Sequence, residues 1–231
     1  KGREKEVQRI FDKWDLHAVQ IGHVKSGNKM IVREGDQVIA DIPAKALADE
    51  GPIYQREMKE PAYYAEAKRF NMDNVSTPRD MGAVLKQLLG SPSICSKEWV
   101  YEQFDHMVRT DTVFLPGHDA ALVRVKGRRL GIAVSTDCNG LYTYLDPYEG
   151  GKHAVAEAAR NVVCSGAKPV AITNCLNFGN PMKPEIFWQF RRAVEGMRDA
   201  CLKFNTPVTG GNVSFYNESP RGAVYPTPVV G

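Results

Sequence analysis

The chain has 231 residues, of which 43% are apolar and 25% charged, and its 30 Lys and Arg against 27 Asp and Glu give a net charge of +3. This apolar content argues against disorder, and the length fits about one and a half domains of roughly 150 residues. The charges are interspersed and no apolar run approaches about 18 residues, so we expect neither a nucleic-acid surface nor a membrane span. Because Lys1–Ile10 is charged and unlike a signal peptide, we expect a cytoplasmic protein.

The cysteines are odd in number and include no Cys-x-x-Cys pair, which argues against a disulfide framework and a zinc knuckle. We expect free thiols, most of them buried. The five are Cys95, Cys138, Cys164, Cys175 and Cys201.

The first 50 residues show the pattern of a helix followed by strands. Apolar residues at i, i+3, i+4 and i+7 predict an amphipathic helix over Glu4–Trp14. Strands are predicted over Ala18–Val24 and Met30–Ile42, the second turning at Glu34–Asp36. These elements are too few for an independent core. With no initiator Met and an apolar run at its end, the chain is expected to be a piece of a longer protein.

Residues 53–110 have the composition of a linker with helices, since prolines and mixed charges alternate there. A helix is plausible over Pro61–Phe70. Two more are predicted over Pro78–Leu89, with Pro78 in the first turn behind Ser76 and Thr77, and over Ser96–Met107, capped by Ser96.

From residue 111 onward strands and helices alternate, which predicts an α/β or α+β domain. Helices are expected over Gly151–Gly166 and Pro184–Phe204. The expected strands are Ala120–Val125 and Leu130–Thr136, which form a hairpin, and the shorter Pro169–Thr173 and Thr206–Thr209.

Three polar, glycine-rich segments fall where these strands are expected to end, over residues 135–140, 173–181 and 210–217. Ligands of α/β sheets bind at such ends, where glycines let phosphate approach backbone N–H groups and Asn offers an oxygen to Mg²⁺. Ordinary turn chemistry is the alternative interpretation.

Glu157 and Asn161 are four residues apart and share a helix face. With Asp119 at the mouth of a strand, they would provide hard oxygen ligands for Mg²⁺. The alternative is a solvated helix face. The adjacent His118 points to the opposite side of an extended chain and is not expected to be catalytic. The sequence has neither a nucleophile elbow nor a P-loop.

Five segments together resemble phosphoribosylformylglycinamidine synthase, in its small bacterial-type synthetase subunit. The resemblance runs through essentially the whole chain in order. The segments are Leu115–Ala121, Glu149–Asn161, Asn174–Pro181, Pro184–Gln189 and Gly210–Asn217.

The resemblance implies a fold shared with aminoimidazole ribonucleotide synthetase and selenophosphate synthetase, in an internally duplicated pair of halves. It assigns residues 1–52 to the C-terminal part of the first-half α+β domain, 53–110 to a linker with helices, 111–225 to the second-half N-terminal nucleotide-binding-type domain, and 226–231 to the start of the last domain.

The resemblance also implies a reaction. Formylglycinamide ribonucleotide condenses with ammonia, which a glutaminase subunit delivers from glutamine, while ATP is cleaved to ADP and phosphate. ATP activates the amide oxygen as a phosphate ester that ammonia displaces, and Mg²⁺ offsets phosphoryl charge. The partners implied are the substrate, the glutaminase subunit and a small accessory subunit, with no nucleic acid and no membrane.

The resemblance assigns no catalytic residue to this chain, because the family's catalytic histidines belong to the first half. This chain would supply the opposite wall: Asn174 and Gly211 as ATP contacts, Asn212 as a Mg²⁺ ligand and Ser214 as a substrate contact. In related sequences the position of Asn174 is commonly Asp. Here a neutral amide replaces that anionic contact, so the assignment of Asn174 as an ATP contact is weaker.

A second, pseudo-equivalent nucleotide site is implied by the duplication, with Asp119, Glu157 and Asn161 as its Mg²⁺ ligands. This leaves a second hypothesis open, in which the chain is a non-catalytic nucleotide-holding scaffold for assembly with the glutaminase subunit. A complete enzyme of a related ATP-dependent family is a third interpretation.

Overall fold

The computed structural model describes residues 2–231, which fall into two compact units that meet between Gln55 and Arg56. We describe each unit by itself. Among the described residues, no helix combines the length and the apolar character that crossing a bilayer requires.

The first unit contains a helix and a hairpin. Helix α1 spans Glu4–Asp12, and the antiparallel strands β1 (Lys29–Glu34) and β2 (Gln37–Pro43) lead into the short helix α2 (Ala44–Ala48). The predicted helix and hairpin are confirmed. The strand predicted over Ala18–Val24 is wrong, because this segment pairs with no strand in the described chain.

The second unit begins with short helices. These are α3 (Ala62–Lys68), η1 (Met72–Asn74), α4 (Met81–Leu89), α5 (Glu98–Tyr101) and η2 (Val108–Thr110). Helix α4 starts later than predicted because the carboxylate of Asp80 caps it, accepting the N–H of Ala83 at 2.9 Å. The helix predicted over Ser96–Met107 is wrong in length, since α5 covers only one turn.

Two tyrosines of this segment anchor α3 to the domain that follows. Tyr64 is buried, and its hydroxyl donates to Asp146 Oδ2 at 3.1 Å. The ring of Tyr63 stacks on Tyr144 with 4.0 Å between centroids, while its oxygen accepts a hydrogen bond from Gln189 Nε2 at 2.7 Å. Helix α3 is therefore attached to the domain that follows.

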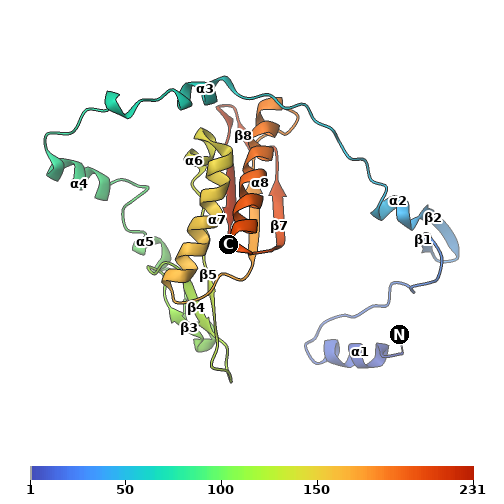
Figure 1. The fold of residues 1–231 in the computed structure, drawn as a ribbon. Coiled ribbons are helices and arrows are strands. Elements are labelled where there is room, and N and C mark those ends of the chain that lie inside the picture. Colours follow the sequence, from blue (N-terminus) through green and yellow to red (C-terminus); the bar gives the residue numbers. More distant parts are fainter. Residues whose placement is uncertain (1) are drawn as a thin grey trace. The chain divides into compact units, whose positions relative to one another are not determined.

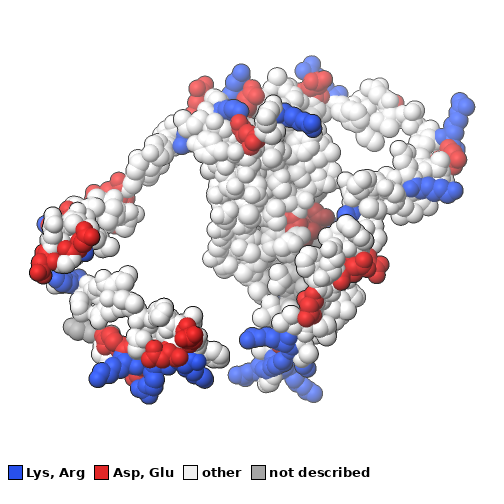
Figure 2. Space-filling model, turned by 180° about the vertical axis from the view of Figure 1, so that it is seen from behind, with Lys and Arg blue, Asp and Glu red and all other residues white. Residues whose placement is uncertain are grey.

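A small antiparallel sheet, β3-β4-β5, contains the predicted hairpin. Its strands are β3 (Thr112–Phe114), β4 (Ala121–Arg124) and β5 (Gly131–Val134). The turn between β4 and β5 projects beyond the sheet in Figure 1. Lys and Arg side chains gather at this end of the molecule in Figure 2.

The main layer is a mixed sheet of order β10-β6-β7. Strand β6 (Ile172–Asn177) lies in the middle, parallel to β7 (Val208–Ser214) and antiparallel to β10 (Thr227–Val230). The two-residue strands β8 (Glu218–Ser219) and β9 (Gly222–Ala223) form a separate ribbon.

Two long helices cover one face of this mixed sheet (Figure 1). The short helix α6 (Gly140–Leu145) leads into α7 (Pro147–Cys164), and α8 (Pro184–Phe204) has the bounds that the sequence predicts. The core lies between the helices and the sheet. It includes Val155, Phe178, Ala193 and Val230, all with 0% exposure. The predicted mixed fold of helices and strands is confirmed.

Glycines let α7 and α8 approach closely. A Cβ on Gly151 would overlap the carbonyl oxygen of Ala193, and one on Gly196 would overlap the carbonyl oxygen of Tyr148. The pairing of the two helices therefore depends on residues without side chains.

Candidate functional site

The predicted ATP and substrate residues lie on neighbouring parallel strands. In the register of β6 and β7, Asn174 faces Gly211, Cys175 faces Asn212 and Asn177 faces Ser214. The strands continue further than predicted, so Asn174, Gly211 and Asn212 lie inside them and not after their ends. Strand β6 pairs with both β7 and β10. This pairing keeps the polar residues in extended strands although they have little strand preference of their own.

Strand alternation divides these residues between the two faces of the sheet. Asn174 lies on the helix-covered face, with the buried Ile172 and Leu176, and its Oδ1 occupies the space that a Cβ on Gly211 would fill. Asn212 lies on the other face, where its Nδ2 is 3.8 Å from Cys175 Sγ.

Ser214 shares the uncovered face with Asn212, because the two are separated by two positions on β7. The structure thus brings the predicted Mg²⁺ ligand together with the predicted substrate contact. The predicted ATP contacts form a separate pair on the other side of the sheet. A ligand that reaches both pairs has to pass over the carboxyl end of the strands, where α/β sheets bind ligands.

Asn217 joins the two loops at this end of the sheet. Its Nδ2 donates to the carbonyl oxygens of Phe178, at 3.0 Å, and Ser214, at 2.8 Å, and its backbone N–H also donates to Phe178 O. Ser214 Oγ donates to Asn217 Oδ1 at 3.3 Å. This network fixes the backbone of Ser214. The Ser214 hydroxyl is therefore held in a defined position at this end of the sheet.

Glu218 of β8 also binds the loop that follows β6. Its carboxylate accepts the backbone N–H of Asn180 at 2.9 Å and pairs with Lys183 Nζ at 2.8 Å. The Lys183 ammonium holds the pKa of Glu218 below its ordinary value, with the Asn180 N–H acting in the same direction. The carboxylate is therefore charged at neutral pH and ties the loop between β6 and α8 to β8.

A second group of acidic and amide side chains lies between α7 and the end of β5. Asn161 Nδ2 donates to both oxygens of Asp137, at 3.1 and 3.0 Å. Burial raises the pKa of the adjacent Cys138 thiol to about 11, and the nearby charges of Glu157 and Asp137 act in the same direction. Asp137 and Glu157 thus both lie near Cys138, and Asn161 contacts Asp137.

Asp119 is not joined to this group. In the described part of the chain, no hydrogen bond or ion pair links Asp119 to Glu157 or Asn161, and its side chain is exposed before β4. Asn161 is bonded to Asp137, and the ligand role of Asp119 stays a prediction.

The residues present fit Mg²⁺ only together with phosphate. Within residues 2–231, no cluster of three or more His, Cys, Asp or Glu side chains has the geometry of a metal site. Mg²⁺ is commonly held by one or two carboxylates plus substrate phosphates. Asp137 and Glu157 are the carboxylates of this group, while Asn161 turns its amide nitrogen to Asp137. Burial raises the pKa of Asp137.

Comparison with known proteins places this geometry in a family. The family model for the AIR synthase related protein N-terminal domain matches residues 117–231. The phosphoribosylformylglycinamidine synthase subunit PurL of Moorella thermoacetica is 56% identical over 231 residues, which are 100% of this chain and 32% of that protein. The same subunit of Alkaliphilus metalliredigens is 53% identical over 232 residues, covering 100% and 31%. The chain belongs to the PurL family. It spans about a third of the length of these curated relatives.

Solved PurL structures have the same fold. Thermotoga maritima PurL complexed with ATP superposes with a TM-score of 0.73 at 27% identity, over 99% of this chain and 35% of that one. The complex of that PurL with FGAR gives a TM-score of 0.62 at 28% identity, over 88% and 30%. The T. maritima PurLQS structure gives 0.65 at 28% identity, over 88% and 31%.

Two residues of the candidate site are missed by sequence reasoning. Asp137 and Asn217 both lie in the polar segments that the sequence singles out, but neither is assigned a role there. An Asp or Asn next to a glycine-rich turn has many local hydrogen-bonding options, so composition does not reveal a partner 24 or 39 residues away.

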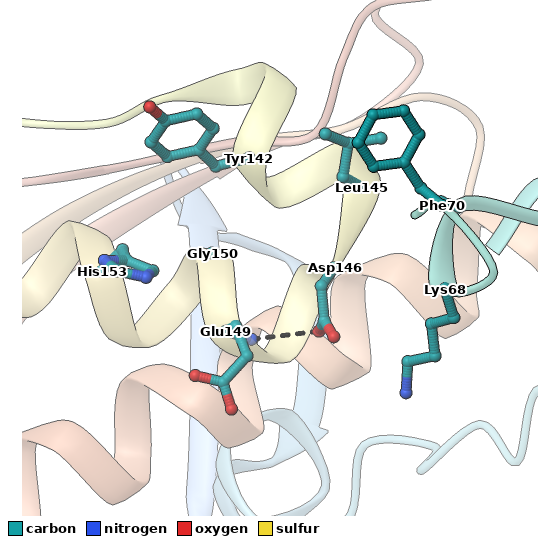
Figure 3. Close-up of a pocket in the computed structure, with 9 residues that line it drawn as sticks. Lys68, Phe70, Tyr142, Leu145, Asp146, Glu149, Gly150 and His153 are labelled. Carbon is teal, nitrogen blue, oxygen red and sulfur yellow. Dashed lines mark hydrogen bonds between the residues drawn. The ribbon is translucent and has the colours of Figure 1, made fainter. Parts of the chain in front are cut away.

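A separate cavity of about 710 Å³ lies between the end of α3, α6 and the start of α7 (Figure 3). Phe70, Tyr142 and Leu145 form an apolar wall. Its carboxylates already have partners, since Asp146 caps α7 by accepting the N–H of Glu149 at 3.1 Å, and Glu149 pairs with Lys152 outside the cavity. We assign no ligand to it.

Proposed function

We propose that this chain is part of a PurL-type synthetase subunit, an ATP-dependent carbon–nitrogen ligase of purine biosynthesis. The reaction joins ammonia to formylglycinamide ribonucleotide with cleavage of ATP and gives formylglycinamidine ribonucleotide. Support comes from whole-chain similarity to PurL subunits and from the T. maritima relatives that bind ATP and FGAR. Five unpaired cysteines suit a reducing compartment, so we place the protein in the cytoplasm.

The chain would supply one wall of the ATP and substrate site. Asn174 and Gly211 would contact ATP, Asn212 would hold Mg²⁺ and Ser214 would contact the substrate. The observation that carries this proposal is the placement of Asn212 and Ser214 together on the uncovered face of β7, beside the loops that Asn217 fixes. Mg²⁺ held by Asn212 would compensate the charge of the phosphoryl group in transfer.

No residue of the chain is assigned to proton transfer in this proposal. We therefore expect the chain on its own to show no ammonia-dependent turnover. Measurable ATP cleavage by the isolated chain, coupled to product formation, would contradict the assignment of the chemistry to other parts of a synthetase.

Asn212→Ala in a full-length synthetase that contains this chain tests the proposed site. We expect kcat to fall by about 100-fold, because a fixed group that acts on transition-state charge is lost. The melting temperature should change little, since the Asn212 side chain is exposed and, among the described residues, its one polar contact is the long one to Cys175 Sγ. Asn74→Ala, on the exposed η1 turn, is the matched control and should alter neither. Parallel losses of stability and activity in Asn212→Ala would favour the turn interpretation.

The proposal includes two protein partners, a glutaminase subunit that delivers ammonia and a small accessory subunit. The T. maritima PurLQS structure, a relative of this chain, supports an assembly with further subunits. Copurification of the glutaminase and the small accessory subunit with the full-length synthetase would test both partners. The copurification should be measured with and without glutamine and nucleotide.

The second candidate function is a nucleotide-holding scaffold, and the group formed by Asp137, Glu157 and Asn161 favours it. Titration of the full-length synthetase with ADP and Mg²⁺ separates the two alternatives for the acidic ligand. Asp137→Asn should weaken binding at this site. Asp119→Asn should not, because in the described chain Asp119 makes no hydrogen bond to Asn161, whose partner is Asp137. The reverse result would restore the ligand set expected from the sequence.

A further inference from the structure

The turn between β4 and β5 concentrates positive charge. Backbone hydrogen bonds between Val125 and Leu130 and between Arg128 and Val125 close the turn, and Gly127 has a φ of +75°. We define the basic tip as Arg124, Lys126, Arg128 and Arg129, together with Arg109, whose carbonyl oxygen accepts a hydrogen bond from Lys126 Nζ.

A single carboxylate forms ion pairs with the basic tip. Asp111 pairs with Arg124 Nε at 3.3 Å and with Lys126 Nζ at 3.5 Å. In the described residues, Arg128 and Arg129 have neither an ion pair nor a side-chain hydrogen bond, although they are adjacent like charges. Five cationic groups against one carboxylate leave the tip strongly positive, and this charge favours binding of an anionic surface.

The chemistry of the tip favours a protein carboxylate surface over a nucleic acid. The tip projects from the sheet (Figure 1), so a partner meets it as a protrusion. Guanidinium groups form paired hydrogen bonds with carboxylates. The segment from Arg124 to Leu130 contains no aromatic residue on which a base could stack, and Leu130, with 62% exposure, adds an apolar contact of the kind protein partners bury.

We propose that the basic tip docks an acidic surface of another subunit of the synthase assembly. This inference rests on the proposed function, because the assembly is part of it. A change at the basic tip should then impair subunit docking without impairing the ammonia-dependent reaction. The tip carries none of the residues assigned to ATP, Mg²⁺ or substrate.

The test is Arg128→Glu/Arg129→Glu in the full-length synthetase, with the purified glutaminase and small accessory subunits as probes. We expect the dissociation constant of the assembly to rise by at least about tenfold at low salt, with a shallower salt dependence than the unmodified protein. Glutamine-dependent turnover should fall accordingly. Turnover with added ammonium chloride should stay within about twofold, because it bypasses the partner.

Arg79→Glu/Lys86→Glu, with Arg79 just before α4 and Lys86 on it, carries the same change of charge and should leave assembly and both activities unaltered. The milder Arg128→Gln/Arg129→Gln serves if the reversal disturbs folding by far-UV circular dichroism. Unchanged assembly, an equal effect of the α4 pair, or loss of the ammonia-dependent rate would each overturn the proposal, as would loss of bound RNA as the only effect of the reversal. Absence of any ammonia-dependent rate in the unmodified synthetase would instead contradict the proposed function.

Discussion

The two units contain similar apolar side chains but bury them very differently. Every buried residue that the structure describes lies between Pro61 and Val230, and none lies within residues 2–55. In the first unit Trp14 is 66% and Ile21 is 99% exposed, whereas Phe178 in the second unit is 0% exposed. Apolar content alone therefore does not create a core.

The difference follows from the number of layers. The second unit places two helices against a three-stranded sheet, so each element buries its apolar face on another. The first unit has one two-stranded hairpin and short helices, and an isolated hairpin is only marginally stable in water. We expect the second unit to account for most of the stability of the chain.

The largest expected effect is at the centre of the second unit. Phe178→Ala should lower the free energy of unfolding by about 4 kcal/mol, because it leaves a cavity in a fully buried site next to Phe190. Ile21→Ala in the first unit should change it by less than about 0.5 kcal/mol. Urea unfolding followed by circular dichroism measures both. Similar losses for the two variants would break the comparison.

The next effect concerns the contact between α7 and α8. Gly196→Ala should lower the free energy of unfolding by about 2 kcal/mol, since overlap with the carbonyl oxygen of Tyr148 outweighs the better helix propensity of Ala. At Gly22 a Cβ meets no atom within 4 Å, so Gly22→Ala is the matched control and should be nearly neutral. Stabilisation by Gly196→Ala would show that propensity dominates.

A smaller effect is expected where α3 is anchored. Tyr63→Phe removes the oxygen that accepts from Gln189, a side chain with only 5% exposure, and should cost about 1.5 kcal/mol. Burial raises the pKa of Tyr63 to about 12, so spectrophotometric titration should find this phenol protonated at pH 10. Tyr216→Phe, at an exposed position, should be neutral. Equal stability of the two variants would make α3 a loosely attached segment.

The smallest effect tests the buried charge of Asp137. Burial raises its folded-state pKa above the ordinary 3.8, so folding favours the protonated form. Stability is then highest below the unfolded-state pKa and falls as pH rises through the folded-state pKa. Asp137→Asn should therefore raise the melting temperature slightly at pH 7, with the gain shrinking toward pH 4. A loss of stability in Asp137→Asn at pH 7 would contradict the assigned cause.

Much of the fold follows from sequence periodicity. The apolar stripe of α8 and the proline in its first turn define its bounds, and the turn at Glu34–Asp36 defines the first hairpin. The segment Ala18–Val24 has the composition of a strand but lacks a partner, which only tertiary structure provides. The reverse holds for the polar residues of β6 and β7, where pairing in the sheet overrides weak local preference.

The candidate site shows the same division between local and distant information. The sequence predicts that Asn174, Gly211, Asn212 and Ser214 lie in polar, glycine-rich segments close to one another. It does not predict which face of the sheet each one occupies, because that depends on where the strands begin and end. The partner of Asn161 is Asp137 and not Asp119, because the end of β5 approaches α7. Distances of this kind are set by packing between layers and are not encoded in a spacing.

The central claim is that Asn212, on the uncovered face of β7, holds the divalent cation of the reaction. Crystals of a full-length synthetase containing this chain, grown with Mn²⁺ and a non-hydrolysable ATP analogue, test it through the anomalous signal of the metal. The account predicts a Mn²⁺ peak within about 2.3 Å of Asn212 Oδ1, close to the distances of a directly coordinated divalent cation. A fully occupied Mn²⁺–nucleotide site with Asn212 uncoordinated would contradict it.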